Sequence, residues 1–66
     1  MDLTVFSKKL KRLTFESNRT QRSIAEELGV SECVYSRMVH GHRAPTLDQF
    51  IKLAGVFGCK MEDFLD

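Results

Sequence analysis

Residues 20–40 read TQRSIAEELGVSECVYSRMVH, and this stretch carries two helix start signals separated by a turn. Thr20 is a favourable N-cap for a helix over about residues 21–28, because its hydroxyl can accept a hydrogen bond from the first turn. Ser31 is an equally good N-cap for a helix that reaches about residue 40. The stretch therefore predicts two short helices joined by the three-residue turn Gly-Val-Ser.

The residues between these helices are typical of a tight turn. Gly29 stands where a helix end favours a left-handed residue, and Val30 is expected to point back into the core. Ala25, in the middle of the first helix, is small enough to let the second helix cross closely. Together these residues predict a helix-turn-helix over about residues 21–40.

The segment before this motif reads as another helix. Its apolar residues recur at i, i+4 and i+7, with one more a turn earlier, and basic residues fill the other side. The apolar residues are Leu3, Phe6, Leu10 and Leu13. Asn18 and Arg19 are expected to form the joint to the next helix.

The segment after the motif is predicted to form a fourth helix and a short fifth one. Thr46 and Gln49 make a capping box at the start of the fourth helix, and Gly58 ends it. The inner face expected for this helix is Leu47, Phe50, Ile51, Ala54 and Phe57. Lys60 is a poor N-cap for the last helix. No alternating pattern indicates a strand, so the sequence predicts an all-α domain of five short helices.

Length and composition restrict the possible functions. A chain of 66 residues allows one small domain, covering residues 1–66, and is very short for an enzyme. No apolar run approaches the roughly 20 residues of a membrane span, and the N-terminal residues do not resemble a signal peptide. Two cysteines are too few for a disulfide scaffold and fit a reducing compartment. We therefore expect a cytoplasmic protein that does not associate with membranes.

The net charge of +1 conceals an uneven distribution along the chain. Residues 1–43 hold eight basic groups against five acidic ones, which gives +3. Residues 44–66 hold two basic groups against four acidic ones, which gives −2. The first part is therefore suited to face a polyanion, although chance segregation of ordinary surface charge explains the same numbers.

The helix that follows Ser31 divides into two faces when it is read at 100° per residue. Val34, Tyr35, Met38 and Val39 fall on one side and are expected to face the core. The opposite side is polar and consists of Glu32, Cys33, Ser36, Arg37 and His40. In a DNA major groove, Arg37 has the fork that suits guanine, and Glu32 can accept from cytosine. A solvated helix face is the alternative explanation of this pattern.

From Phe6 to Leu65 the sequence resembles the phage repressor and Cro family of helix-turn-helix DNA-binding domains, also called the XRE family. The matching run is Thr20-Gln21, Ile24-Ala25, Leu28-Gly29-Val30-Ser31, Ser36-Arg37-Met38, Gly41, Arg43-x-Pro45-Thr46-Leu47, Leu53-Ala54, Gly58 and Glu62-Asp63-Phe64-Leu65. The resemblance implies a compact lambda-repressor-like domain and a sequence-specific transcriptional regulator, expected to be a repressor. It also implies a homodimer on a palindromic operator in double-stranded DNA, in the nucleoid of a bacterium or phage-infected cell.

The resemblance implies roles for individual residues. The base-reading positions of the recognition helix are Glu32, Cys33, Ser36 and Arg37. The positions expected to bind phosphate are Gln21 and Arg22 at the start of the preceding helix, and His42 and Arg43 in the following loop. A solvated loop is the alternative for the last two.

Three positions depart from the family pattern. The family usually pairs an arginine late in the first helix with a glutamate late in the third, where this chain has Thr14 and Val39. Both charges are absent together, so we expect a change in packing and not in binding. Tyr35 replaces a smaller residue, and its hydroxyl needs a partner, an exit to water or a phosphate. Cys33 is an uncommon base-reading residue.

The C-terminal end, about residues 56–66, is the predicted dimer interface. It has more apolar side chains than one short helix must bury, namely Val56, Phe57, Met61, Phe64 and Leu65. The alternative is that these residues only complete the core of the monomer.

Other kinds of site find less support in the sequence. No catalytic arrangement is evident, and no cofactor or small-molecule ligand is expected. Cys33, His40 and His42 do not make a metal site, because no fourth ligand is evident. Redox sensing by Cys33 is opposed by the neighbouring Glu32. Two other functions share the expected fold: a protein-interaction module, such as an anti-repressor or antitoxin partner, and an accessory recombination factor that bends DNA.

Overall fold

The computed structural model describes residues 3–64 of the chain. Its elements in order are α1 (Leu3–Glu16), α2 (Gln21–Leu28), α3 (Glu32–Val39), α4 (Leu47–Phe57) and the 3-10 turn η1 (Met61–Phe64). Over these residues the chain has no strand, which confirms the all-α prediction. The helix count differs slightly from the five predicted, because the last element is a single 3-10 turn.

The predicted N-cap residues Thr20, Ser31 and Thr46 all cap their helices. The Thr20 hydroxyl accepts a hydrogen bond from the Ser23 N–H at 3.0 Å, and the Ser31 hydroxyl accepts one from Val34 at 3.2 Å. Thr46 and Gln49 form the reciprocal capping box, with bonds of 3.0 and 3.1 Å. Each cap satisfies N–H groups that the first turn of a helix leaves without a partner.

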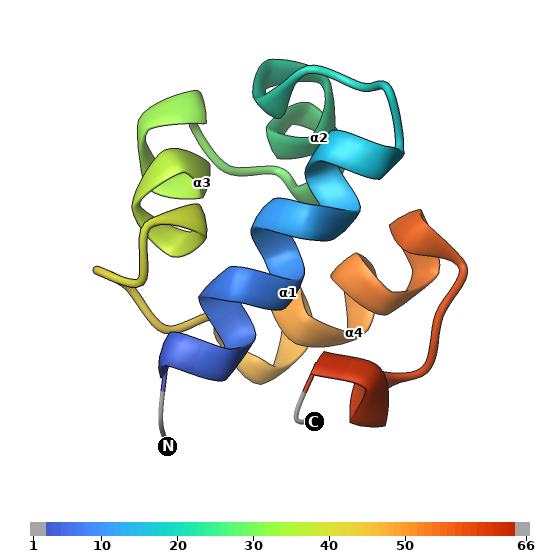
Figure 1. The fold of residues 1–66 in the computed structure, drawn as a ribbon. Helices are drawn as coiled ribbons and strands as arrows, with labels where there is room; N and C mark the ends of the chain where they lie inside the picture. Colours follow the sequence, from blue (N-terminus) through green and yellow to red (C-terminus); the bar gives the residue numbers. More distant parts are fainter. Residues whose placement is uncertain (1–2, 65–66) are drawn as a thin grey trace.

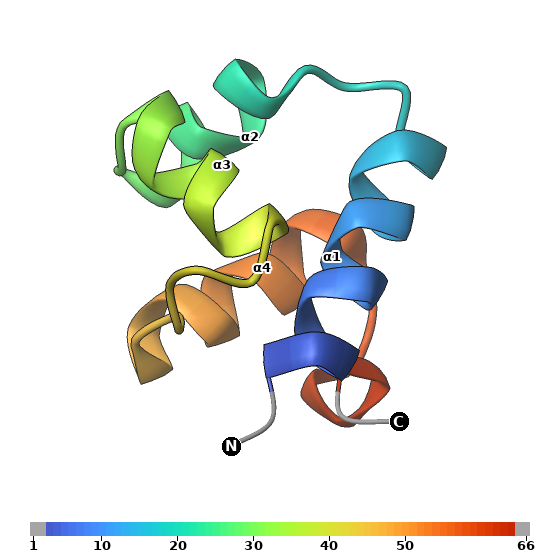
Figure 2. The same ribbon diagram turned by 60° about the vertical axis from the view of Figure 1, so that its left-hand side comes forward.

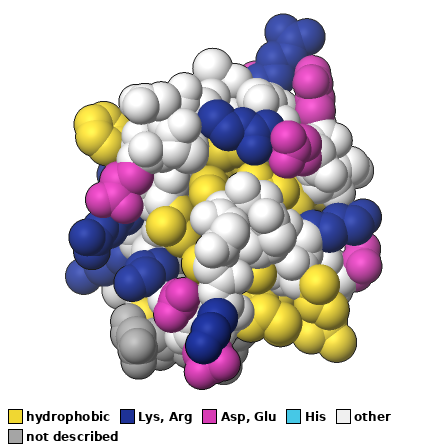
Figure 3. Space-filling model, turned by 90° about the vertical axis from the view of Figure 1, so that its right-hand side faces the viewer, with side chains coloured by type: hydrophobic (Ala, Val, Ile, Leu, Met, Phe, Trp, Pro, Cys, Tyr) yellow, Lys and Arg dark blue, Asp and Glu magenta, His cyan; other side chains and the backbone are white. Residues whose placement is uncertain are grey.

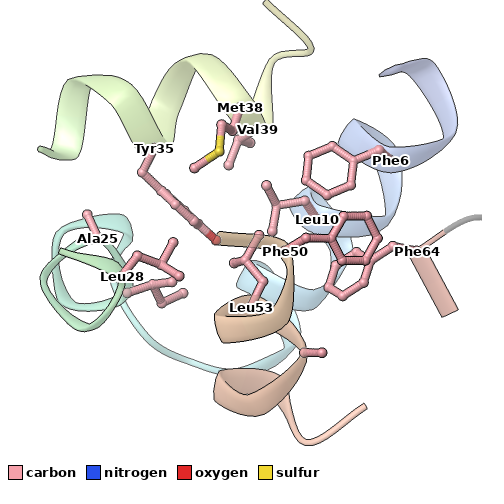
Figure 4. Packing of buried hydrophobic residues seen from close by; sticks show 12 residues of the cluster. Phe6, Leu10, Ala25, Leu28, Tyr35, Met38, Val39, Phe50, Leu53 and Phe64 are labelled. Atoms are coloured by element: carbon pink, nitrogen blue, oxygen red, sulfur yellow. The ribbon is translucent and has the colours of Figure 1, made fainter. Parts of the chain in front are cut away.

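The helices pack around one core. Figure 1 shows α1 running across the molecule in front of α4, and Figure 2 shows α2 and α3 next to each other on the side away from α1. Figure 4 shows the buried side chains of all these elements converging between them. The rings of Phe6, Phe50 and Phe64 form a cluster with centroid separations of 5.3–5.8 Å. This cluster joins the first helix to the end of the described chain.

Burial of Phe64 corrects one residue of the predicted dimer interface. Its side chain is 0 % exposed in the monomer core and has no surface to offer to a second copy. Val56, Phe57 and Met61 are half-buried and pack against the same core, while Leu65 lies outside the described residues. The apolar surplus at this end therefore serves mainly the monomer.

The weak cap at Lys60 is compensated by a side chain further along. The Lys60 N–H donates to the Asp63 carboxylate at 3.1 Å, and the Asp63 N–H donates to the Lys60 carbonyl at 3.0 Å. This reciprocal pair closes the turn that places Phe64 in the core.

The predicted inner face of α4 is wrong at two positions. Leu47 is 71 % exposed and Ile51 is 52 % exposed, whereas Leu53 is fully buried. The apolar residues of α4 span more than half of the helix circumference, and the core covers the part centred on Phe50 and Leu53. Leu47 and Ile51 stand at the edge of that arc and face outward.

Thr14 and Tyr35 account for the first two departures from the family pattern. The Tyr35 ring is fully buried, and its hydroxyl lies 2.6 Å from Thr14 Oγ1. Thr14 Oγ1 also donates to the Leu10 carbonyl at 2.7 Å. A carbonyl can only accept, so the single Thr14 proton is used there and the Tyr35 O–H must be the donor to Thr14. The large tyrosine thus fits because the residue opposite is a small hydroxyl acceptor.

Candidate nucleic-acid interface

One face of the predicted recognition helix α3 packs against the core, and the opposite face is exposed to solvent. Tyr35, Met38 and Val39 are buried, as predicted, while Val34 is half-buried. The outward residues Glu32, Cys33 and Arg37 are exposed, and Ser36 is half-buried beside them. The four predicted base-reading residues therefore share one side of a helix whose orientation is fixed by the core.

The two charged residues of this face have their polar groups free. Within residues 3–64, neither the Glu32 carboxylate nor the Arg37 guanidinium has a hydrogen bond or an ion pair. A guanidinium without a protein partner can form the two parallel bonds that recognise guanine, and a free carboxylate can accept from cytosine. The geometry of α3 therefore leaves both charged groups available to a ligand.

The loop after α3 presents its basic residues at the end of the same helix. His42 and Arg43 are both exposed. The Gly41 N–H donates to Met38 O at 3.2 Å and the His42 N–H donates to Arg37 O at 2.9 Å, while Gly41 has a φ of 77°. This pattern of bonds ends a helix through a left-handed residue and fixes the direction in which the loop leaves it.

The start of α2 supplies the other predicted phosphate contacts. Gln21 is the first residue of α2 and is half-buried, and Arg22 is exposed. Arg22 lies 3.6 Å from Glu26 in a solvent-exposed pair on the same helix. Such pairs contribute little, so Arg22 remains able to turn toward a phosphate.

Arg19 has a structural role that the sequence did not reveal. Its guanidinium donates to Glu27 and to the Ser23 hydroxyl, both at 2.8 Å. These bonds tie the joint after α1 to the outer side of α2. The positive charge of Arg19 is therefore paired with a carboxylate of the protein itself.

A hollow of about 440 Å³ lies between the end of α1, the start of α2 and the end of α3. Gln21 lines it together with Lys11, Phe15 and His40. Phe15 is 84 % exposed, and the His40 Nδ1 lies 2.8 Å from the Ser36 carbonyl. Lys11 and His40 are further polar groups beside Gln21. Neither is among the predicted phosphate-binding residues, although Lys11 belongs to the basic side of α1 and His40 to the polar side of α3.

The cysteines do not form a centre of their own. Both are free thiols, with Cys33 exposed and Cys59 half-buried. Burial, and next the negative charge of Asp63, raise the pKa of the Cys59 thiol above its ordinary value, which keeps it protonated. Among residues 3–64, no three His, Cys, Asp or Glu side chains are grouped so that they could hold a metal ion.

Comparison with known proteins assigns this arrangement to a family. Residues 9–64, which include all four α-helices in whole or in part, match the family described as Helix-turn-helix. The chain belongs to the XRE-type helix-turn-helix family. No curated protein matches the sequence. As a family member, the protein is a DNA-binding transcription regulator, and α2 with α3 is its helix-turn-helix unit.

A solved structure of similar fold supports the architecture of this family member. The chain is similar to the restriction-modification controller protein C.AhdI from Aeromonas hydrophila, with a TM-score of 0.85 and 22 % sequence identity. The similarity covers 96 % of this chain and 91 % of that one. In the part of this helix-turn-helix protein that the structure describes, no helix is long and apolar enough to cross a membrane.

Proposed function

We propose that this protein is a transcriptional repressor that binds a palindromic operator as a homodimer, with α3 of each copy in the major groove. The observation that carries the proposal is the open face of α3, where Glu32 and Arg37 have no protein partner within residues 3–64. Buried side chains on the other face hold this helix in one orientation, as base reading requires. Its proposed place of action is the nucleoid of a bacterial or phage-infected cell.

The proposed contacts separate into two groups. Arg37 and Glu32, with Cys33 and Ser36, read base edges. Gln21, Arg22, His42 and Arg43 lie on both sides of α3 along the chain and bind backbone phosphates, which position the helix without reading sequence. Repression follows from occupancy of a promoter by the bound dimer.

Two copies are needed because one such domain makes few base contacts. A single module of this size buries a small protein–DNA interface, and a two-fold dimer doubles it. Successive major grooves on one side of DNA are about 34 Å apart, so the operator is expected to contain two inverted half-sites with this spacing.

The test is selection of binding sites from random DNA, followed by affinity measurements on single-base variants of the selected site. Arg37→Ala is expected to cost about 1–3 kcal/mol on the selected site and to lose discrimination at one base pair of each half-site. Arg43→Ala is expected to weaken all sequences alike and to reduce the salt dependence of binding. Lys60→Ala, in the exposed loop before η1, removes the same charge far along the chain from α3 and serves as the control.

The outcome separates the proposed function from its alternatives. If Arg37→Ala and Arg43→Ala give the same profile across the variants, α3 does not read bases. Strong bending of the selected DNA without effect on a fused promoter indicates an accessory recombination factor. Absence of any selected sequence favours the protein-interaction module, for which the exposed Phe15 is the available aromatic side chain.

A further inference from the structure

The hollow between α1, α2 and α3 adjoins the polar face of α3. His40 belongs to that face, one turn after Ser36, and its exposed ring lines the hollow. Gln21 at the start of α2 and Lys11 on α1 line it from two other sides. When α3 lies in a major groove, the hollow is therefore expected to face the DNA backbone at the edge of that groove.

The side of α1 that carries Lys11 also adjoins the loop after α3. A Cβ built on Gly41 would lie 3.2 Å from Ser7 Oγ, so the loop and the helix are in contact there. Ser7 and Lys11 are four residues apart and share one side of α1. Figures 1 and 2 both show the end of α3 beside α1. Lys11 therefore lies on the same side of the molecule as the predicted phosphate-binding residues His42 and Arg43.

The charges of the hollow suit an anion. Among the described residues that line it there is no Asp or Glu. The Lys11 ammonium has no hydrogen bond or ion pair within residues 3–64, whereas the charge of Arg19, which also lines the hollow, is paired with Glu27. Other parts of the surface are mixed: Figure 3 shows Lys and Arg side chains beside Asp and Glu on the side to the right in Figure 1.

The hydrogen bond of His40 decides when its ring can bind an anion. Its Nδ1 lies 2.8 Å from the Ser36 carbonyl oxygen, and a carbonyl can only accept, so Nδ1 carries a proton. Nε2 of the neutral ring is then an acceptor, which a phosphate oxygen repels. In the doubly protonated ring Nε2 is a donor with a positive charge behind it. His40 can therefore hold an anion only as the imidazolium.

The charged groups around His40 are mostly positive. Lys11 comes from α1, Arg19 with its partner Glu27 from the joint before α2, and Arg37 from the preceding turn of α3. The start of α2 adds only the neutral Gln21, and the basic loop follows in the chain. A phosphate bound among these groups supplies the negative partner that the imidazolium otherwise lacks. Phosphate binding and protonation of His40 therefore favour each other, as linkage requires.

We infer that the hollow binds one further phosphate of the DNA backbone, held by the Lys11 ammonium and by Nε2 of the protonated His40. This inference rests on the proposed docking of α3 in the major groove and adds a contact from α1. Phe15, which is 84 % exposed at the rim, offers an apolar surface to the sugar attached to this phosphate. Because histidine changes its charge between about pH 5 and 8, DNA binding strengthens as the pH falls through this range.

The test replaces single phosphates of the selected DNA site with uncharged methylphosphonate and measures the affinity of the full chain for each DNA. The wild type is expected to lose affinity at several phosphates, and Lys11→Gln to become insensitive at one of these for each bound copy. On unmodified DNA, Lys11→Gln is expected to bind about threefold to tenfold more weakly, and its salt dependence to flatten by about 0.9 in logarithmic slope for each bound copy.

Lys9→Gln is the matched control for Lys11→Gln. It removes the same charge from the same helix, but from the side where Lys9 lines a different hollow with Cys59 and Asp63. It is expected to keep the wild-type response to every methylphosphonate. Lys11 and His40 are both exposed, so their replacement is expected to leave the circular dichroism spectrum unchanged.

His40→Gln tests the part played by the proton. At constant ionic strength the wild type is expected to bind the selected DNA at least about threefold more tightly at pH 6 than at pH 8. His40→Gln is expected to lose most of this difference, and methylphosphonate at the Lys11 phosphate to remove the same part from the wild type. His42→Gln removes the other histidine and is expected to keep the pH-dependent effect of that phosphate.

The inference and the proposed function fail in different ways. If Lys11→Gln and His40→Gln respond to every methylphosphonate and to pH as the wild type does, the hollow holds no phosphate, and base reading by α3 is unaffected. Equal losses in Lys9→Gln and Lys11→Gln also overturn the site, because they indicate only general attraction of charge. A wild-type chain that selects no DNA overturns the proposed function and the inference with it. Insensitivity of Lys11→Gln and His40→Gln to one and the same phosphate, with Lys9→Gln unchanged, supports the site.

Discussion

The buried hydroxyl pair of Thr14 and Tyr35 should respond unequally to removal of its two members. The Tyr35 O–H donates to Thr14 Oγ1 at 2.6 Å, and the Thr14 O–H donates to the Leu10 carbonyl at 2.7 Å. Tyr35→Phe removes the donor and leaves the Thr14 proton bonded. Thr14→Val removes the acceptor and leaves a phenol O–H buried with no partner.

The expected losses in the free energy of unfolding differ because of this asymmetry. Tyr35→Phe loses one net hydrogen bond, which costs about 0.5–1.5 kcal/mol. Thr14→Val leaves an unsatisfied buried donor and costs about 1–3 kcal/mol. The Leu10 carbonyl keeps its helical N–H partner in both cases, because residues 10 and 14 are one turn apart within α1. The double variant is expected to cost less than the sum of the singles, since neither buried polar group remains unpaired.

Urea unfolding followed by circular dichroism measures all four free energies of unfolding. In a chain of this size a change of 1 kcal/mol also shifts the melting temperature by about 4–8 °C, so thermal melts give an independent reading. If Tyr35→Phe costs more than Thr14→Val, the assignment of donor and acceptor is wrong. If the double variant costs the full sum of the single variants, the two hydroxyls are not coupled.

The same pair predicts a loss of stability in alkali. Burial raises the pKa of Tyr35 above its ordinary value, with the Thr14 hydrogen bond acting in the opposite direction. Below about pH 10 the phenol is neutral in both folded and unfolded chains, and its contribution to stability is complete. Above that pH the unfolded chain ionises first, so stability falls as the pH rises through the folded-state pKa.

The titration can be read directly because the chain has one tyrosine and no tryptophan. Phenolate absorbance is expected to appear at higher pH in the folded protein than in urea. Tyr35→Phe should remove this part of the alkaline loss of stability. A folded-state titration at or below that of the unfolded chain contradicts the burial argument.

Four further substitutions test the fold. Leu53→Ala is expected to destabilise the protein by about 2–5 kcal/mol in urea unfolding, whereas Ile51→Ala changes the monomer by no more than about 0.5 kcal/mol, because only the first side chain is buried. Gly29→Ala is expected to cost about 1 kcal/mol in thermal unfolding, since φ is 74° there although a Cβ would have free space. Thr46→Ala removes the capping box of α4 and is expected to cost about 1 kcal/mol by the same measurement; an unchanged melting temperature contradicts this role.

Capping residues and turns were predictable from the sequence because they act locally. Thr20, Ser31 and the pair Thr46–Gln49 cap the helices they were assigned to. A hydroxyl before an apolar-periodic segment needs only its own first turn to be satisfied, and tertiary structure does not alter that requirement. The polar side of α3 was predictable for a similar reason, since its fully buried and its exposed residues lie on different sides of the helix, with Val34 and Ser36 half-buried between them.

The exposure of Leu47 and Ile51 was not predictable, because an apolar arc wider than the core allows more than one orientation of α4. Sequence spacing places Phe50 on the inner side but does not say on which of its flanks the core ends. The burial of Phe64 has a similar origin. Its partners, Phe6 and Phe50, are distant in sequence and are brought to it only by the whole fold.

The pairing of charges in the structure changes what the basic part of the chain can contribute to DNA binding. Arg12, Arg19 and Arg22 each lie within an ion pair with a glutamate, so three of the eight basic groups of residues 1–43 are offset locally. Fewer cations are then free to displace counterions from DNA, and a single copy is expected to bind weakly. If two copies act together, binding also depends on assembly, because dimer concentration rises with the square of chain concentration below the dimer dissociation constant. In this range, operator occupancy at low saturation should therefore rise with a slope near two in a logarithmic plot.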